Sequence, residues 1–232
     1  LKESRAEIES ALAEGRFHLN QIANFSGPAL PAGQTGIQGW AEPCPIGVFA
    51  IISPWNFPVN VMNRKTLPAL LTGNTVVFNP HPSGKRIAAE GARRYNEAIY
   101  RDLGIDNLMC VIVEPTLETA DRIFKHRDVN LLCVTGGPGV AKAAMQQAKR
   151  AIVAGPGNPP VVVDETADLE QAARDIVAGA SFDNNLVCVL EKEIIVVDAV
   201  ADALKAALVA HGAYQLESWE MARLVKVILP EV

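Results

Sequence analysis

The sequence contains few cysteines, and no two of them stand at metal-binding or redox spacing. Only four occur in the chain, and none forms a CxxC pair: Cys44, Cys110, Cys133 and Cys188. This pattern argues against a zinc cluster or a disulfide framework and favours a reducing cytosol, so we expect no metal site. Two of the four, Cys110 and Cys133, fall in apolar, strand-like runs, where a reduced cysteine acts as a small hydrophobic side chain.

The chain also lacks basic clusters, long apolar stretches and a secretory leader. Its formal net charge is -5 and its lysines and arginines form no run, which argues against nucleic acid as a partner. No apolar stretch approaches the roughly 18 residues that would span a membrane. The first residues, Leu1 to Ile8, are polar and helix-patterned, so we expect no secretory signal there.

The composition is that of a soluble globular α/β protein, with 49% hydrophobic and 20% charged residues. A chain of 232 residues can form one large domain or two small ones. It begins without methionine and stops at Leu229–Val232 without an evident terminal element. We therefore expect it to be part of a longer protein.

Strand-like and helix-like segments alternate along much of the sequence. Residues 1–40 predict a helix and then a glycine- and proline-rich connector from Gly27 to Gly36. The predicted strands are Val48–Ile52, Thr75–Phe78, Met109–Val113 and Leu131–Val134, and the predicted helices are Lys85–Leu103, Leu117–His126 and Val140–Arg150. This alternation is typical of right-handed βαβ crossovers, and the unbroken apolar runs indicate a parallel sheet buried on both faces.

A break at Ala154–Pro160, with two glycines and three prolines, predicts a domain boundary near Gly155. We expect a dinucleotide-binding domain over residues 1–154 and a second α/β domain, only partly present, over 155–232. In the second segment, the expected elements are a strand at Val161–Val163, a helix after Thr166 or Asp168, a strand at Ile194–Val197 and a helix at Val200–Ala210.

Two strand-end turns carry groups suited to a ligand. In Ser53–Pro58 (Ser-Pro-Trp-Asn-Phe-Pro), prolines of fixed φ flank Asn56 and favour a fixed amide that donates to an oxyanion. Thr135–Val140 opens a helix with glycines, whose N–H groups and partial positive charge suit phosphate. It is not a GxGxxG motif. Ordinary turns would explain each of the two segments taken alone.

A third turn, Asn79–Lys85, follows the next strand. Because α/β folds bind ligands at the carboxyl ends of parallel strands, Ser83 or Lys85 is a candidate for a ribose or phosphate contact. The prolines around His81 make a rigid connector an equal alternative, and a metal or general-base role for His81 is the weaker reading.

Cys188 differs from the strand cysteines because the polar residues Asp183–Asn185 precede it on a short loop between a helix and a strand. A nucleophilic thiol needs exposure and a nearby helix terminus or cation. The loop makes Cys188 a candidate nucleophile, with a structural cysteine as the alternative.

Together these segments resemble the NAD(P)-dependent aldehyde dehydrogenase superfamily, which carries a strand-end Pro-Trp-Asn-Phe-Pro, a Gly-Asn-Thr-Val-Val and a Thr-Gly turn ahead of the cysteine loop. Here these stand at Pro54–Pro58, Gly73–Val77 and Thr135–Gly139. A narrower match covers most of residues 73–216 and is similar to the CoA-acylating acetaldehyde and propionaldehyde dehydrogenases. It consists of Asn79–Pro82, the Thr-Gly-Gly-Pro-Gly turn, Gly157–Pro160, Asp164–Asp168 and Gly179–Asn185.

The resemblance implies a Rossmann-type cofactor domain followed by part of a catalytic domain. It implies NAD-dependent, reversible oxidation of a short-chain aldehyde to acyl-CoA through a thioacyl intermediate on Cys188, with Asn56 as oxyanion donor. Coenzyme A is then the co-substrate, and NADP is an alternative to NAD. The cofactor-binding residues that it implies are Ser53, Pro54, Trp55, Asn79, His81, Thr135, Gly136 and Gly139.

The sequence also departs from the family's patterns. Ser53–Pro58 looks more like the hydrolytic aldehyde dehydrogenases, Val187 stands where acylating relatives often have proline, and Asn79 replaces a lysine of many relatives. The Asn79 replacement leaves the choice between NAD and NADP open. Hydrolytic relatives use a glutamate to activate water, whereas the corresponding turn, Gly155–Asn158, has no carboxylate. Two alternatives remain: a hydrolytic enzyme, and a non-catalytic cofactor-binding fragment.

The resemblance further implies homo-oligomers for full-length relatives and a cytoplasmic location, or the lumen of a bacterial microcompartment. Residues 1–14 are patterned more like a surface helix than a targeting helix. The length of the aldehyde's chain is not readable from these residues.

Overall fold

The computed structural model describes residues 2–25, 27–30 and 39–228. The chain divides into two compact units, Leu1–Pro156 and Gly157–Val232, each with its own sheet and core. The sequence predicts a boundary near Gly155, and the functions assigned to the two domains stay predictions. Residues 31–36 of the expected connector, and the end Leu229–Val232, lie outside the described residues.

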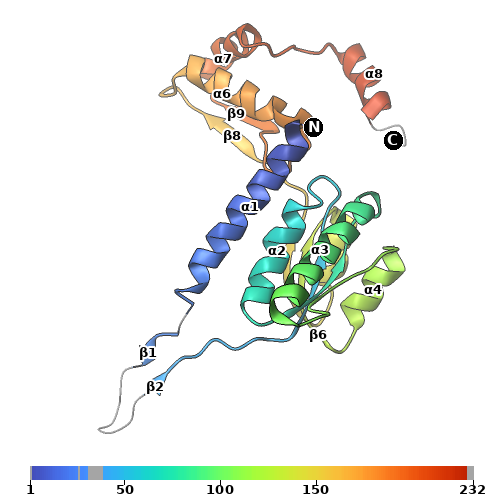
Figure 1. The fold of residues 1–232 in the computed structure, drawn as a ribbon. Coiled ribbons are helices and arrows are strands. Elements are labelled where there is room, and N and C mark those ends of the chain that lie inside the picture. Colours follow the sequence, from blue (N-terminus) through green and yellow to red (C-terminus); the bar gives the residue numbers. More distant parts are fainter. Residues whose placement is uncertain (1, 26, 31–38, 229–232) are drawn as a thin grey trace. The chain divides into compact units, whose positions relative to one another are not determined.

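The first unit is built on a five-stranded parallel sheet (Figure 1). Its strands are β3 (Val48–Ile52), β4 (Thr75–Asn79), β5 (Met109–Val111), β6 (Val129–Thr135) and β7 (Arg150–Ala154). They lie in the order β5-β4-β3-β6-β7, and every neighbouring pair is parallel. The predicted α/β class is therefore confirmed. The chain moves outward from β3 and then returns to β6, so the two strands form a switch point where open α/β sheets bind ligands.

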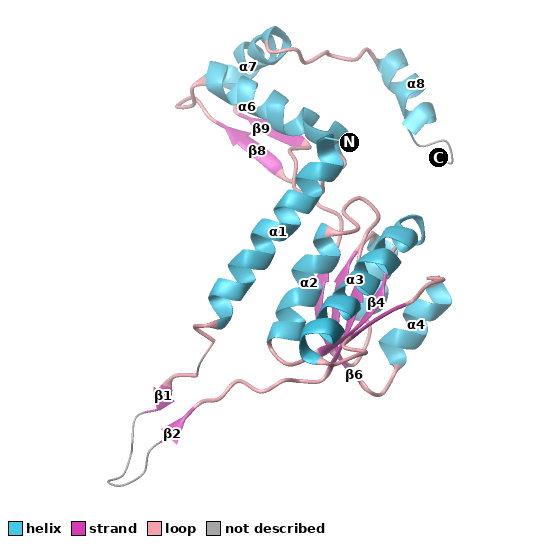
Figure 2. Cartoon of the chain, in the orientation of Figure 1, coloured by secondary structure: helices cyan, strands magenta, loops and turns pink. Residues whose placement is uncertain are grey.

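Helices cover both faces of this sheet (Figure 2). One face packs against α2 (Asn60–Leu71) and α3 (Lys85–Leu103), and the other against α4 (Leu117–Lys125) and α5 (Pro138–Met145). Successive strand residues point to opposite faces, so the neighbours Ile51 and Ile52 enter different cores. Burial on both faces explains the unbroken apolar runs of the central strands.

The long helix α1 (Lys2–Ile22) packs against α2. The Glu7 Oε1 atom accepts hydrogen bonds from the N–H groups of Val59, at 2.8 Å, and Asn60, at 3.0 Å. The N-cap residue of α2 makes no side-chain bond of its own. A carboxylate from α1 thus caps the positive end of the helix that follows the Pro-Trp-Asn-Phe-Pro motif.

Two sequence expectations for the first unit are wrong. The sequence predicts a helix over Val140–Arg150, but α5 ends at Met145 and β7 pairs with β6 as a fifth strand. The apolar run of β7 is too short for periodicity to separate a strand from a helix end. Cys110 is exposed rather than buried, because β5 is an edge strand whose neighbouring residue Met109 is the one that enters the core.

Smaller elements complete the first unit. The strands β1 (Ala29–Leu30) and β2 (Gly39–Trp40) pair antiparallel. A 3-10 turn, η1 (Pro82–Gly84), leads directly into α3. No helix of the described residues is long and apolar enough to cross a membrane.

The second unit contains a two-stranded parallel sheet, β8 (Pro160–Val163) and β9 (Glu193–Val196). The helices α6 (Leu169–Ser181) and α7 (Asp198–Ala210) pack on one face of it. Their shared core consists of Val163, Ala173, Ile176, Leu204 and Ala207. A 3-10 segment, η2 (Phe182–Asn185), follows α6. The last described helix, α8 (Ser218–Ile228), is not among the elements that the sequence predicts, and none of its residues is buried.

The start of α6 decides between its two candidate caps. The Asp168 carboxylate accepts a hydrogen bond from the Gln171 N–H at 3.1 Å, so Asp168 is the N-cap. Thr166 instead donates from its N–H and its hydroxyl to the Asp164 carboxylate, at 2.9 and 2.6 Å. These two bonds lower the pKa of Asp164, and its carboxylate therefore shapes the turn that precedes α6.

Candidate active site

A cavity of about 480 Å³ opens at the carboxyl ends of β3, β4 and β6, at the switch point of the sheet. The turns that follow these three strands line it, together with residues 115–120 at the start of α4. It is lined by all eight residues that the sequence predicts as cofactor-binding: Ser53, Pro54, Trp55, Asn79, His81, Thr135, Gly136 and Gly139. The fold thus brings together residues from three turns that are far apart in the sequence.

Ser53 gives the clearest sign that this cavity accepts a polar ligand. Its side chain is 3% exposed, and its hydroxyl oxygen has no hydrogen-bond partner among the described residues. A buried hydroxyl without a partner costs free energy unless a ligand or water supplies the bond. A ribose or phosphate oxygen in the cavity would satisfy it.

The glycine turn after β6 suits a phosphate. Added Cβ atoms at Gly137 and Gly139 would meet nothing within 4 Å, so the backbone there is open to a ligand. Gly137 is the N-cap of α5, and no side chain caps that end in the described structure. The first N–H groups of the helix are therefore donors without intrahelical partners, at its positive end.

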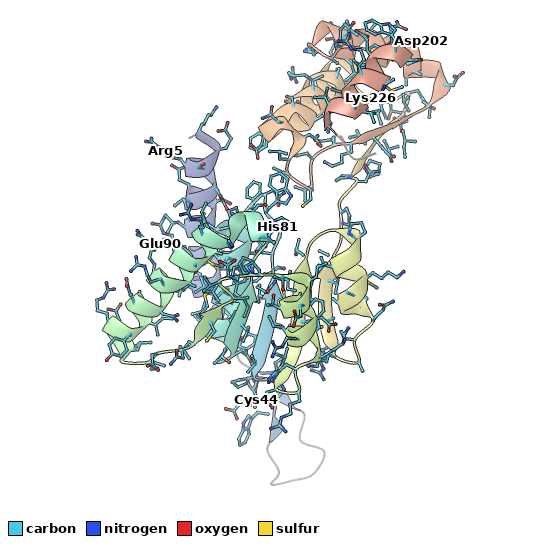
Figure 3. All side chains as sticks on the ribbon, turned by 90° about the vertical axis from the view of Figure 1, so that its right-hand side faces the viewer. Arg5, Cys44, His81, Glu90, Asp202 and Lys226 are labelled. Atoms are coloured by element: carbon cyan, nitrogen blue, oxygen red, sulfur yellow. The ribbon has the colours of Figure 1, made fainter. Side chains whose placement is uncertain are left out.

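Asn79 and His81 form the opposite wall, after β4. Asn79 is buried, and its Oδ1 lies 2.9 Å from the Thr119 hydroxyl of α4. The His81 Nδ1 atom accepts a hydrogen bond from the Ser83 N–H at 3.1 Å. In the neutral ring this leaves Nε2 as the donor. His81 lies at the carboxyl end of the sheet, whereas Cys44 lies beyond the other end (Figure 3).

Lys65 of α2 ties together the two strands at the switch point. Its Nζ donates to the carbonyl oxygens of Ile52, at 2.9 Å, and Cys133, at 3.2 Å. Burial of the ammonium lowers the pKa of Lys65 to about 8, although nearby Cys133 opposes this shift. Burial also raises the pKa of the Cys133 thiol. Lys65 thus holds β3 and β6 immediately before the turns that line the cavity.

Asn56 lies in the same loop as Ser53, one residue after Trp55, and is half-buried. It is not among the residues that line the cavity. Its place in a proline-flanked loop after β3 agrees with the position from which the sequence predicts an oxyanion donor, and that role stays a prediction.

Cys188 belongs to the second unit and is exposed. It lies in a turn that the Leu190 N–H closes by donating to the Val187 carbonyl at 3.4 Å. An added Cβ at Gly157 would overlap the Cys188 carbonyl oxygen, so the turn Gly157–Pro160, part of the family resemblance, packs directly against the cysteine. Only glycine allows this approach.

The cysteine loop also packs closely on α6. The Glu191 carboxylate lies against Gly179, where an added Cβ would overlap Oε2. That oxygen is buried and has no hydrogen-bond partner within the part of the chain that the structure describes. A larger residue at position 179 would therefore require the end of the Glu191 side chain to move.

Sequence reasoning missed Lys65, Thr119 and Lys192, which hold the turns of the site. Thr119 had a readable signal, since Thr116 and Thr119 form a capping box at the start of α4. Lys65 donates to the carbonyls of two strands, and Lys192 donates to two carbonyls of the cysteine loop; residue spacing gives no sign of such contacts. Among the described residues, no group of three or more His, Cys, Asp or Glu is placed to hold a metal ion.

Comparison with known proteins identifies the class to which this site belongs. The family model described as "Aldehyde dehydrogenase family" matches residues 1–217, and the chain belongs to this family. Within the family, it falls in the CoA-acylating acetaldehyde and propanal dehydrogenase branch. It is 39% identical over 235 residues to a propanal dehydrogenase (CoA-propanoylating) of Citrobacter freundii, covering 99% of this chain and 51% of that protein. The chain thus spans about half the length of the curated relatives that it matches.

Solved structures agree with this placement. A cysteine-to-alanine mutant of propionaldehyde dehydrogenase from a Clostridium phytofermentans microcompartment superposes with a TM-score of 0.82 at 33% identity, over 97% of this chain and 57% of that one. Rhodopseudomonas palustris propionaldehyde dehydrogenase, with bound CoA and an acylated cysteine, gives 0.79 at 37% identity, over 90% and 47%. Other solved relatives hold propionyl-CoA or NADP+.

Proposed function

We propose that this chain carries the cofactor site and the nucleophile of a CoA-acylating aldehyde dehydrogenase, which oxidises a short-chain aldehyde to acyl-CoA. The observation that carries the proposal is the cavity at the switch point, because all eight residues expected to contact a dinucleotide line it. Membership of the aldehyde dehydrogenase family also supports it.

The dinucleotide is proposed to be NAD. Ser53 and the N–H groups at the start of α5 suit its ribose and phosphate oxygens, and the bound nicotinamide would accept the hydride. The described residues that line the cavity include no lysine or arginine. The 2′-phosphate of NADP would therefore enter without a cation to pair with it, and this favours NAD.

The chemistry proposed for Cys188 begins with addition of its thiolate to the aldehyde carbonyl carbon. The oxyanion of the resulting thiohemiacetal would accept hydrogen bonds from the Asn56 amide and from the Cys188 N–H. Loss of hydride from that carbon to the cofactor converts the thiohemiacetal into a thioester on Cys188. Attack by the thiolate of CoA then forms acyl-CoA and releases the Cys188 thiolate.

The proposed acyl acceptor is CoA rather than water. Hydrolysis of the thioester needs a base to activate water. The turn packed on Cys188 presents Gly157, where a side chain would overlap the cysteine's carbonyl oxygen, and Gly155–Asn158 contains no carboxylate. A thiol that ionises more readily than water needs no such base. Bound CoA in the Rhodopseudomonas relative gives further support.

The test follows NADH formation from propionaldehyde and NAD, with and without CoA. The variants are Cys188→Ala and, as a matched control, Cys110→Ala, which removes another exposed cysteine that does not line the cavity. We expect CoA-dependent turnover that Cys188→Ala abolishes and Cys110→Ala leaves unchanged. Replacing NAD with NADP should lower kcat/KM by at least about tenfold.

Each remaining outcome has a defined meaning. NADH formation that is indifferent to CoA would favour the hydrolytic alternative and contradict the proposed acceptor. No turnover, with a melting temperature that NAD still raises, would indicate a cofactor-binding fragment, because a ligand of the native state stabilises it. Equal turnover by Cys188→Ala would remove the proposed nucleophile.

A further inference from the structure

The loop that precedes Cys188 has an unusual backbone. Three consecutive residues, Asp183, Asn184 and Asn185, have φ values of 47°, 52° and 58°. Residues other than glycine normally visit the left-handed region singly, because their Cβ crowds the following carbonyl. Asn and Asp tolerate it best, but a run of three persists only where surrounding contacts determine it.

The Asn185 side chain supplies part of that determination. Its Nδ2 donates to the Ala180 carbonyl at 2.7 Å and to the Glu191 carbonyl at 3.1 Å. The first acceptor lies near the end of α6, and the second lies just before β9. One amide group therefore closes the whole loop at its base, and both of its N–H donors are used.

Lys192 supplies the rest, from the position directly before β9. Its Nζ donates to the Asn185 Oδ1 at 2.6 Å, to the Val187 carbonyl at 3.3 Å and to the Leu190 carbonyl at 3.4 Å. An ammonium group has three donors, and each has an acceptor here. The loop is therefore folded around this cation, although the side chain itself is on the surface.

Cys188 lies at the tip of the turn that these bonds close. Val187 and Leu190, whose carbonyls bind Lys192, are the first and last residues of that turn. From the other side, the carbonyl of Cys188 rests against Gly157. The Lys192 N–H also donates to the Pro159 carbonyl at 3.2 Å, so one residue joins the cysteine turn to the glycine turn.

We propose that Lys192 is a positioning residue, whose ammonium group, together with the Asn185 amide, fixes the strained loop and holds Cys188 at the tip of its turn. The role of the cysteine as nucleophile rests on the proposed function, whereas the order of the loop does not. A lysine in this role acts through the backbone carbonyls to which it donates. Its charge and its length therefore matter for the order of the loop, and it needs no contact with substrate.

Amide hydrogen exchange of the intact chain tests the proposal without any assay of activity. In Lys192→Met, which keeps much of the apolar stem but no donor, we expect exchange in residues 186–191 to be faster by about tenfold or more. Exchange within α6 and α7 should stay as in the parent. Lys205→Met is the matched control, since Lys205 is an exposed lysine of the same unit whose nearest acidic oxygen is 3.8 Å away.

Two further variants make the exchange result specific to this network. Lys192→Arg keeps the charge and the donors, so we expect exchange in residues 186–191 close to that of the parent. Asn185→Ser removes the opposite half of the network and should reproduce the effect of Lys192→Met. If both Lys192→Met and Asn185→Ser accelerate exchange throughout α6 and α7 as well, the network stabilises the unit as a whole and the proposal is overturned.

The kinetic readout separates positioning from general stability. Lys192→Met should lower kcat by about tenfold or more, with KM for NAD within about twofold of the parent and with recovery in Lys192→Arg. The role of Lys192 would be overturned if exchange in residues 186–191 were the same in Lys192→Met as in the parent. It would also be overturned if the parent were active and Lys192→Met had the same kcat. If the parent showed no CoA-dependent turnover, only the proposed function would be contradicted. The exchange measurement would then be the test of the positioning role of Lys192.

Discussion

The two units bury their strands in different ways. In β3 of the first unit, the neighbours Ile51 and Ile52 are 0% and 6% exposed, because helices pack on both faces of the sheet. In β8 of the second unit, Val163 is 2% exposed and its neighbour Val162 is 73% exposed. The described helices α6 and α7 pack on the Val163 face only.

This difference shows that a run of β-branched residues has two structural outcomes. Alternate side chains of a strand always point to opposite faces, but the number of layers decides whether both faces are buried. The first unit has two cores on one sheet, and the second has one. We therefore expect substitutions at neighbouring positions to have similar effects in β3 and unequal effects in β8.

The largest effects are expected in β3. Ile51→Ala and Ile52→Ala should each lower the free energy of unfolding by about 2 to 5 kcal/mol, because each leaves a cavity in a closely packed core. Urea unfolding followed by circular dichroism measures both. A cost below about 1 kcal/mol at either position would mean that one face is not packed as the structure has it.

A pH-dependent effect of similar size is expected at Lys65, which ties β3 to β6. Its pKa is lowered from 10.5 to about 8 in the folded chain, so the unfolded chain binds more protons between these values. The free energy of unfolding therefore rises with pH across this window. The cost of burying the charge is fully present below pH 8 and is relieved above it, by up to about 3 kcal/mol.

The measurement compares the parent with Lys65→Met by urea unfolding at pH 7.5 and pH 9.5. We expect the stability of the parent relative to the variant to increase with pH. Lys142→Met, at an exposed position of α5, is the matched control for loss of a lysine. The burial of this ammonium would be contradicted if the stability of the parent relative to Lys65→Met did not increase with pH. It would also be contradicted if the stability of the parent relative to Lys142→Met increased by the same amount.

In β8, the expected effects separate. Val163→Ala should destabilise the second unit by about 1 to 3 kcal/mol, because it removes buried apolar volume. Val162→Ala, one residue away on the exposed face, should stay within about 0.5 kcal/mol. Amide exchange within α6 reports on this unit by itself. Equal effects at the two positions would remove the contrast with β3.

Helix caps should have smaller effects, similar in both units. Thr116→Ala removes the capping box of α4 and Asp168→Ala the cap of α6, and each should cost about 1 kcal/mol. Exchange of the first-turn amides of each helix is the readout. Much larger losses at only one cap would show that the two units differ in local structure as well as in layering.

The sequence predicted the parts of the site that depend on local chemistry. Pro54 and Pro58 mark a rigid turn, Gly136 to Gly139 mark an open helix start, and polar residues mark the loop of Cys188. The cavity of the first unit also required the strand order, because the turns after β3, β4 and β6 become neighbours only in the folded sheet. The family resemblance implied a Rossmann-type sheet, but the strand order comes from the structure.

Other features left no trace in the sequence. The sequence predicts a helix end where β7 lies, because the pairing of β7 with β6 is not a local property. It predicts a hydrophobic environment for Cys110, because the position of β5 at the edge of the sheet is not a local property either. The bonds from Lys65 and Lys192 to carbonyl oxygens were equally invisible, since every residue has a carbonyl and only the fold brings particular ones together.

The sequence by itself determined the alternation of strands and helices, the turns at the strand ends and the residue types at the candidate site. These follow from backbone preferences and side-chain periodicity, which act over a few residues. The tertiary structure alone decided which strands are central, which face of each strand is covered and which carbonyls the lysines hold. Those features depend on contacts between residues that are distant along the chain, and the sequence around one residue does not specify which distant residues it will contact.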